Sequence, residues 1–169
     1  MLVLGVDPGT TVTGYGLVRE EKGRLVSLEF GGIITSPRRD LPQRLYKIYQ
    51  ELQGIIRRGR PDCLAVEGLF FAKNVKSALK LGQARGVVLL AAVEAGIEVV
   101  EYSPLEVKGA VTGYGGADKS QVQRMVQSLL RLKRLPEPPD AADALALAIC
   151  HIHSLALKRK IEPLKKEIR

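Results

Sequence analysis

Residues 2–10 read LVLGVDPGT, an apolar run that ends on a carboxylate and a Pro-Gly turn. The run from Leu2 to Val6 favours a β-strand that is covered on both faces. Pro8 and Gly9 end this strand. Asp7, at its exit, either accepts backbone N–H groups in a turn or faces a metal ion or a phosphate. The second interpretation requires further acids elsewhere in the chain.

Length and composition suit a single soluble domain. With 169 residues, the chain is expected to bury about 70% of the surface that it exposes when unfolded. Its net charge of +8 favours a polyanionic partner such as nucleic acid. Cys63 and Cys150 stand in apolar surroundings and suit a reducing cytoplasm as buried hydrophobes. The uncharged run from Val87 to Val93 is too short to span a bilayer, so we expect a cytoplasmic protein without membrane contact.

Hydrophobic periodicity predicts alternating strands and helices after the first strand. Strands are expected over residues 13–19, 24–35, 61–67 and 97–102, and helices over 41–59 and 77–95, within 103–116, from Asp118 and from Asp140. The main order, β-β-β-α-β-α-β-α-α, predicts an α/β protein with a mixed five-stranded sheet and helices on both faces. Residues 1–157 are expected to form this domain, and the charged residues 158–169 a disordered basic tail.

Three further acids could join Asp7 at one point. Glu67 ends an apolar strand as Asp7 does, and the first and fourth strands of a small mixed sheet lie side by side. Asp140 and Asp143 are three residues apart at a helix start and share one face, although alone they suit a cap and a first-turn acid. A helix over the strand ends would bring all four carboxylates together. They could all ionise there only with cations present.

Such a cluster predicts a magnesium site. Ligands that are all oxygen atoms select Mg²⁺ or Mn²⁺, and two ions about 3.5–4 Å apart suit in-line hydrolysis of a phosphodiester. Lys119 is in the first turn of the helix after Asp118, where the helix dipole disfavours a cation. Its position there indicates an anionic ligand nearby.

Five motifs resemble the RuvC family of bacterial Holliday-junction resolvases. They are GVDPG around Asp7, VEGLFFAKN around Glu67, SALKLGQARG over 77–86, ADKSQVQ over 117–123 and DAADALALAI over 140–149. The resemblance covers residues 1 to 155 in order and spacing. It implies an RNase H-like fold, a homodimer, and Mg²⁺-dependent paired nicking of four-way DNA junctions, which leaves 5′-phosphate and 3′-hydroxyl ends. The RuvA and RuvB branch-migration proteins would be partners.

The same resemblance assigns roles to single residues. It makes Asp7, Glu67, Asp140 and Asp143 the catalytic ligands of two Mg²⁺ ions, which Mn²⁺ could replace. Lys108 and Lys119 would contact DNA or its phosphates, and Phe70 would stack on a base at the junction. Lys73 and Lys76 follow in a basic loop and are expected to contact the DNA backbone, unless the loop is merely a solvated one.

Three other interpretations concern larger parts of the chain. Residues 77–95 are expected to form a helix whose second half is apolar nearly all round, which favours a dimer interface over a position deep inside one subunit. The DPGTT turn also resembles the first phosphate loop of actin-like and sugar-kinase ATPases, but this chain lacks the second half of that fold. A non-catalytic junction-binding module would tolerate the loss of any one acid, whereas all four are present.

Overall fold

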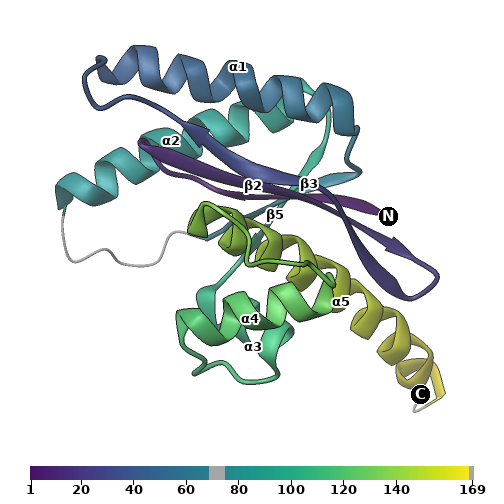
Figure 1. The fold of residues 1–169 in the computed structure, drawn as a ribbon. Helices are drawn as coiled ribbons and strands as arrows, with labels where there is room; N and C mark the ends of the chain where they lie inside the picture. Colours follow the sequence, from purple (N-terminus) through teal and green to yellow (C-terminus); the bar gives the residue numbers. More distant parts are fainter. Residues whose placement is uncertain (69–74, 168–169) are drawn as a thin grey trace.

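One sheet of five strands forms the centre of the molecule, in the order β3-β2-β1-β4-β5 (Figure 1). The computed structural model describes residues 1–68 and 75–167, without the side chains of 75–77, 160 and 162–167. The strands are β1 (Leu2–Asp7), β2 (Val12–Glu21), β3 (Arg24–Ile34), β4 (Cys63–Glu67) and β5 (Glu98–Tyr102). The first three form the predicted antiparallel meander, and β4 and β5 run parallel to β1. The predicted mixed sheet and the pairing of its first and fourth strands are confirmed.

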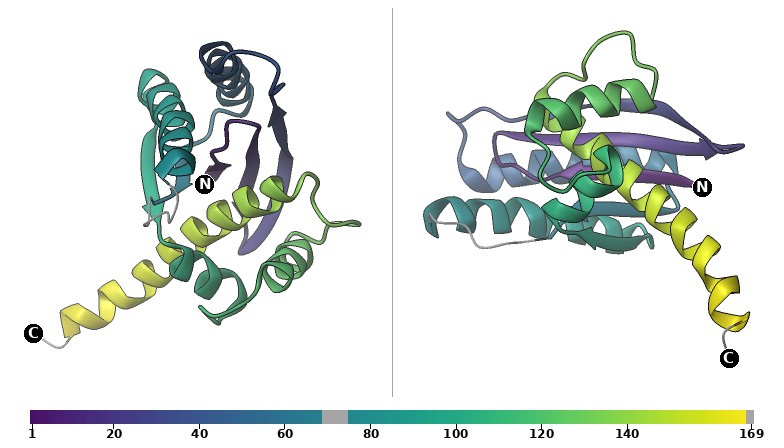
Figure 2. Two further views of the ribbon diagram at one scale, coloured as in Figure 1. Left: turned by 90° about the vertical axis from the view of Figure 1, so that its left-hand side faces the viewer. Right: turned by 90° about the horizontal axis from the view of Figure 1, so that it is seen from below.

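Helices cover both faces of the sheet. They are α1 (Leu41–Gly59), α2 (Val75–Glu94), α3 (Pro104–Thr112), α4 (Lys119–Leu129) and α5 (Pro139–Glu167). α1 and α2 lie on one face, and α3, α4 and α5 lie on the other (Figures 1 and 2). The short helix expected within 103–116 is α3. With it, three helices follow β5, where the main predicted order had two.

Alternation along β1 divides the core into two layers. Leu4 and Val6 point toward α1 and α2 and pack with Leu52 of α1. Val3 points to the opposite face and packs with Leu145 of α5. All five side chains are buried. Because successive strand side chains point to opposite faces, one apolar strand can support both helical layers.

Glycines on β1 and β2 let α5 lie directly against the sheet. A Cβ atom on Gly5 would be 1.8 Å from the carbonyl oxygen of Ala144, and one on Gly14 would be 2.0 Å from the carbonyl oxygen of Asp140. Glycine weakens a strand, and its presence inside one often marks a place where another backbone approaches closely. The contact at Gly14 involves the residue that begins the acidic turn of α5. These glycines therefore set how near the α5 acids come to β1.

The second half of α5 projects beyond the sheet (Figure 2). The helix runs to Glu167, so it continues through most of the segment predicted as a tail, and the boundary at residue 157 stays a prediction. By length and composition alone, residues Pro139–Arg159 could cross a membrane. In the sequence, we considered only the shorter run from Val87 to Val93 for this property. Most of that stretch is buried in this domain, where it forms the helix at the centre of one core layer.

Candidate active site

Asp7 stands at the carboxyl end of β1, before a turn that other side chains hold in place. In an Asx-turn, the Gly9 N–H would donate to the Asp7 carboxylate. It donates instead to Thr13 Oγ1 at 3.3 Å, and the Thr13 hydroxyl donates to the Gly9 carbonyl at 2.7 Å. Arg44 of α1 donates to the next carbonyl, that of Thr10, at 2.6 Å. The turn is therefore fixed without Asp7, and its carboxylate is available for another role.

Three other carboxylates lie near Asp7. β4 ends on Glu67, next to β1, and the first turns of α5 carry Asp140 and Asp143 over the same end of the sheet. Burial first, and then the charges of Asp143, Asp140 and Glu67, together raise the pKa of Asp7 from 3.8 to about 7. Burial and the Asp143 charge also raise the pKa of Glu67. The four predicted acids therefore act on one another electrostatically, as a cluster would.

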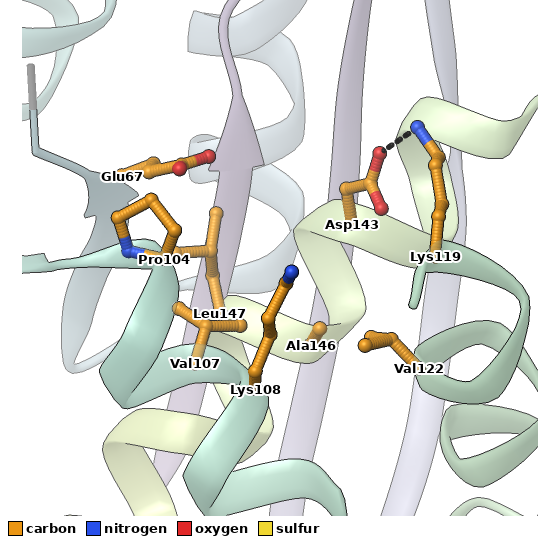
Figure 3. A pocket seen from close by; sticks show the side chains of 9 residues that line it. All are labelled: Glu67, Pro104, Val107, Lys108, Lys119, Val122, Asp143, Ala146 and Leu147. Carbon is orange, nitrogen blue, oxygen red and sulfur yellow. Dashed lines mark hydrogen bonds and ion pairs between the residues drawn. The ribbon is translucent and has the colours of Figure 1, made fainter. Parts of the chain in front are cut away.

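Two lysines line the pocket beside these acids (Figure 3). Glu67 and Asp143 lie on opposite sides of the pocket, and the Lys108 side chain points between them. The Lys119 ammonium donates to Asp143 Oδ2 at 2.6 Å, and this hydrogen bond raises the pKa of Lys119. Lys119 is therefore already paired with a carboxylate of the site, and the anionic ligand expected near it stays a prediction.

Capped helices hold the two lysines at this pocket. Ser103 caps α3 and Asp118 caps α4, each in a reciprocal capping box, with Glu106 and Gln121 as the respective partners. Such caps satisfy backbone N–H groups that the first helical turn leaves unpaired, and each is worth about 0.5–2 kcal/mol. Asp118 is therefore the N-cap of the helix that was predicted to begin there.

The carboxylates suit divalent cations in chemistry and in charge. Oxygen-only donors are those that Mg²⁺ prefers. The pKa of Asp7 is raised by burial and then by three neighbouring carboxylates, and Lys119 only partly offsets this increase. Among the described residues, no three acidic, histidine or cysteine side chains are already placed around one ion position. Ligation would therefore require these side chains to turn, although Asp143 keeps Oδ1 available while Oδ2 pairs with Lys119.

Comparison with known proteins identifies the family. The family model described as "Crossover junction endodeoxyribonuclease RuvC" matches residues 3–151. The chain belongs to the RuvC family. It is 53% identical to the protein of that name from Syntrophomonas wolfei, over 96% of this chain and 94% of the relative. A Chloroflexus aurantiacus RuvC is 54% identical over 91% of this chain and 94% of its own length.

Solved RuvC structures share this fold. A T. thermophilus RuvC in complex with a Holliday junction substrate has a TM-score of 0.89 and 38% identity, over 94% of this chain and 96% of that one. A yeast mitochondrial Holliday junction resolvase has a TM-score of 0.71 but 12% identity over 99% of this chain and 86% of its own, so its likeness concerns the fold alone. The RNase H-like fold predicted from the RuvC resemblance is confirmed.

The structure gathers six of the nine predicted site residues. Glu67, Asp143, Lys108 and Lys119 line the pocket, and Asp7 and Glu67 line its neighbouring hollow. Asp140 lies in the first turn of α5, near enough for its charge to act on Asp7. Phe70 and Lys73 lie outside the described residues, and Lys76 is described only as part of the α2 backbone. Their predicted DNA contacts in this RuvC chain stay predictions.

Sequence reasoning missed two arginines near the acids. Arg44 reaches the turn after Asp7, and Arg85 donates to the main chain of Glu67. Arg85 lies within the SALKLGQARG motif, which we used only for the family resemblance. A single cation on a buried helix face was the signal that could have identified it, because buried charges need specific partners.

The raised pKa of Asp7 predicts how pH and metal affect stability. Without divalent cations, the free energy of unfolding should fall as pH rises from about 4 to 7, because the unfolded chain loses the Asp7 proton first while the folded chain retains it. Mg²⁺ should then raise the melting temperature more at pH 8 than at pH 5, since protons compete with the metal for Asp7.

Thermal melts at both pH values, with and without Mg²⁺, measure this effect. Asp7→Asn serves as the control and should remove most of the difference between the two pH values. An equal response to Mg²⁺ at pH 5 and pH 8 would contradict the prediction.

Proposed function

We propose that this chain is a Holliday-junction resolvase, an Mg²⁺-dependent endonuclease that makes paired symmetric nicks in four-way DNA junctions during recombination and repair. The observation that carries the proposal is the meeting of four carboxylates, from two strand ends and one helix start, beside Lys108 and Lys119. An acidic cluster bordered by cations suits a phosphodiester that must approach bound metal. Membership of the RuvC family favours this activity over the ATPase alternative.

The four acids have one shared role in this proposal. Asp7, Glu67, Asp140 and Asp143 would hold two Mg²⁺ ions, or Mn²⁺ in their place, and these would supply Lewis acidity for attack by water on the phosphodiester. The charges of all three other acids act on Asp7 and raise its pKa. Asp7 is therefore our candidate for the carboxylate shared by both ions. Cleavage would leave 5′-phosphate and 3′-hydroxyl ends.

The lysines at the pocket would bind the substrate phosphate. Lys119 is largely exposed, so its ammonium can move from Asp143 to a DNA oxygen once a metal neutralises that carboxylate. Lys108 points into the same pocket from α3. We propose that Phe70, Lys73 and Lys76 extend this contact along the DNA. The net charge of +8 favours binding of the DNA polyanion by the protein as a whole.

We further propose that α2 forms the interface of a homodimer. One side of α2 is packed in the core through residues such as Ala84, Val88 and Ala91. The other side presents Leu90 and Val93, which are 60% and 69% exposed. Two nicks at symmetric positions need two active sites, and a twofold dimer supplies them. RuvA and RuvB are proposed partners, and the cytoplasm is the proposed location.

Substitution on α2 should separate dimer formation from folding. Leu90→Asp and Val93→Asp are expected to give folded monomers that no longer make paired nicks, because each places a charge in the proposed interface. Leu89 of the same helix packs against the core, so Leu89→Asp should instead lose stability and serves as the contrast. Analytical ultracentrifugation with thermal melts measures both effects. A dimeric Leu90→Asp protein at micromolar concentration would contradict the placement.

A cleavage assay on a synthetic four-way junction tests the proposed function directly. With Mg²⁺ the protein should nick two opposing strands at symmetric positions, and with Ca²⁺ it should bind the junction without cutting, because calcium coordinates at longer and looser distances. A linear duplex of the same sequences is the control substrate and should stay uncut. Failure to nick the junction with either Mg²⁺ or Mn²⁺ would contradict the proposal.

A further inference from the structure

Arg85 is a buried cation on α2 that has two specific partners among the residues that the structure describes. Its side chain belongs to the core-facing side of the helix and is 6% exposed. Nη1 donates to the main-chain carbonyl of Glu67 at 2.6 Å, and Nη2 pairs with the Glu101 carboxylate at 2.5 Å. Removing a guanidinium from water is costly unless its hydrogen bonds are replaced. Arg85 therefore meets that cost through contacts to two neighbouring strands, β4 and β5.

The contact with Glu67 completes the support of one peptide unit. The N–H of Gly68 donates to the carbonyl of Tyr102 at 2.9 Å, and the carbonyl of Glu67 accepts from Arg85. The peptide plane directly after Glu67 is therefore held from both sides. Because this plane fixes the backbone of Glu67, it also fixes the direction in which the carboxylate leaves the strand.

α2 itself is a rigid support for Arg85. Ala84 and Val88 are fully buried on the same helix, so the helix cannot rotate without opening the core. Asp7, Glu67 and Arg85 also line one hollow beside the main pocket. Arg85 thus connects the core side of α2 to the strand end that carries an acid of the site.

We propose that Arg85 is a positioning residue, which holds the end of β4 so that Glu67 faces the other carboxylates. The proposal rests on the function proposed above, because it assumes that Glu67 helps to bind the catalytic cation. Arg85 acts through the main chain of Glu67 and needs no contact with DNA. It also makes the placement of Glu67 depend on α2, the helix proposed to form the dimer.

Two substitutions of Arg85 test this role. Arg85→Met keeps a similar side-chain length but removes both of the nitrogen atoms that make these contacts. Arg85→Lys keeps the charge and a single donor nitrogen, without the forked geometry of the guanidinium. Arg58→Met is the matched control, because Arg58 pairs with Glu29 at 3.0 Å between α1 and β3, away from the acids. For each protein we would measure Mn²⁺ affinity by calorimetry without DNA, junction affinity in Ca²⁺, nicking rate in Mg²⁺, and melting temperature.

Arg85→Met is expected to weaken Mn²⁺ binding and slow nicking by about tenfold to a hundredfold, the usual loss when support behind a metal ligand is removed. Its junction affinity in Ca²⁺ should stay unchanged. Arg85→Lys should bind Mn²⁺ more tightly than Arg85→Met but still several-fold more weakly than the parent protein, because its ammonium can reach the Glu67 carbonyl without the forked geometry of arginine. Arg58→Met should match the parent protein in all four measurements except for a small change in melting temperature.

Unchanged Mn²⁺ affinity in a folded Arg85→Met protein would overturn the proposal. If Arg85→Met does not fold, Arg85→Lys decides: weaker Mn²⁺ binding at an unchanged melting temperature supports positioning, and parent-like Mn²⁺ binding overturns it. A loss of junction affinity equal to the loss of nicking would also overturn it, because Arg85 would then act on DNA binding. The calorimetry uses no DNA, so its result stands even if the parent protein fails to nick junctions.

Discussion

Asp7→Asn is expected to lower the rate of junction nicking by on the order of 10⁴-fold, a scale typical for loss of one central catalytic group. The substitution preserves shape but removes the carboxylate on which the other three acids act. Junction affinity in Ca²⁺ should fall much less, because Lys108 and Lys119 remain. Single-turnover nicking and fluorescence anisotropy on the same four-way junction measure the two effects.

The same variant should be more stable than the parent protein at pH 8 without metal. A neutral amide avoids the cost of ionising a buried group whose pKa is raised to about 7. Asp118→Asn is the matched control, because asparagine is also a good helix cap and Asp118 lies outside the cluster. It should retain nearly full nicking. Substantial nicking by Asp7→Asn would refute the proposal that Asp7 is a central ligand of the metal site.

Gly5→Ala is expected to be severely destabilising, with a loss of about 3 kcal/mol or more in the free energy of unfolding, the upper range for overpacking a core. The new methyl group would lie 1.8 Å from the Ala144 carbonyl oxygen, so α5 must move away from β1. Asp140 and Asp143 would move with it, and nicking should fall further than the fraction of unfolded protein explains. Chemical denaturation and nicking below the melting transition measure these losses.

Gly109→Ala provides the contrast for the same substitution. Gly109 lies inside α3, and a Cβ atom there would meet nothing within 4 Å. Replacing a helical glycine by alanine typically stabilises by about 0.5–1 kcal/mol, because it reduces the freedom of the unfolded chain. A Gly5→Ala protein as stable as the parent would show that α5 does not lie against β1 in this way.

Local patterns in the sequence were enough to predict much of the fold and the identities of the acids. β1 and β4 are apolar runs that each end on one carboxylate, and their pairing follows from the order of strands in a small mixed sheet. The two acids at the start of α5 follow from the helical repeat. The chemistry of the site was readable because carboxylates at such positions have few structural uses. The family motifs agreed with the same four residues.

The distances between these elements were set only by the tertiary structure. Gly5 and Gly14 look like weak points in their strands until α5 is seen lying against them. The pairing of Lys119 with Asp143, and of Arg85 with the Glu67 main chain, joins residues far apart in the chain. A repeat along one element specifies which face is apolar, but not which backbone approaches it or which charge fills a buried space. Those contacts depend on how closely separate elements pack, and that is decided only when the whole chain folds.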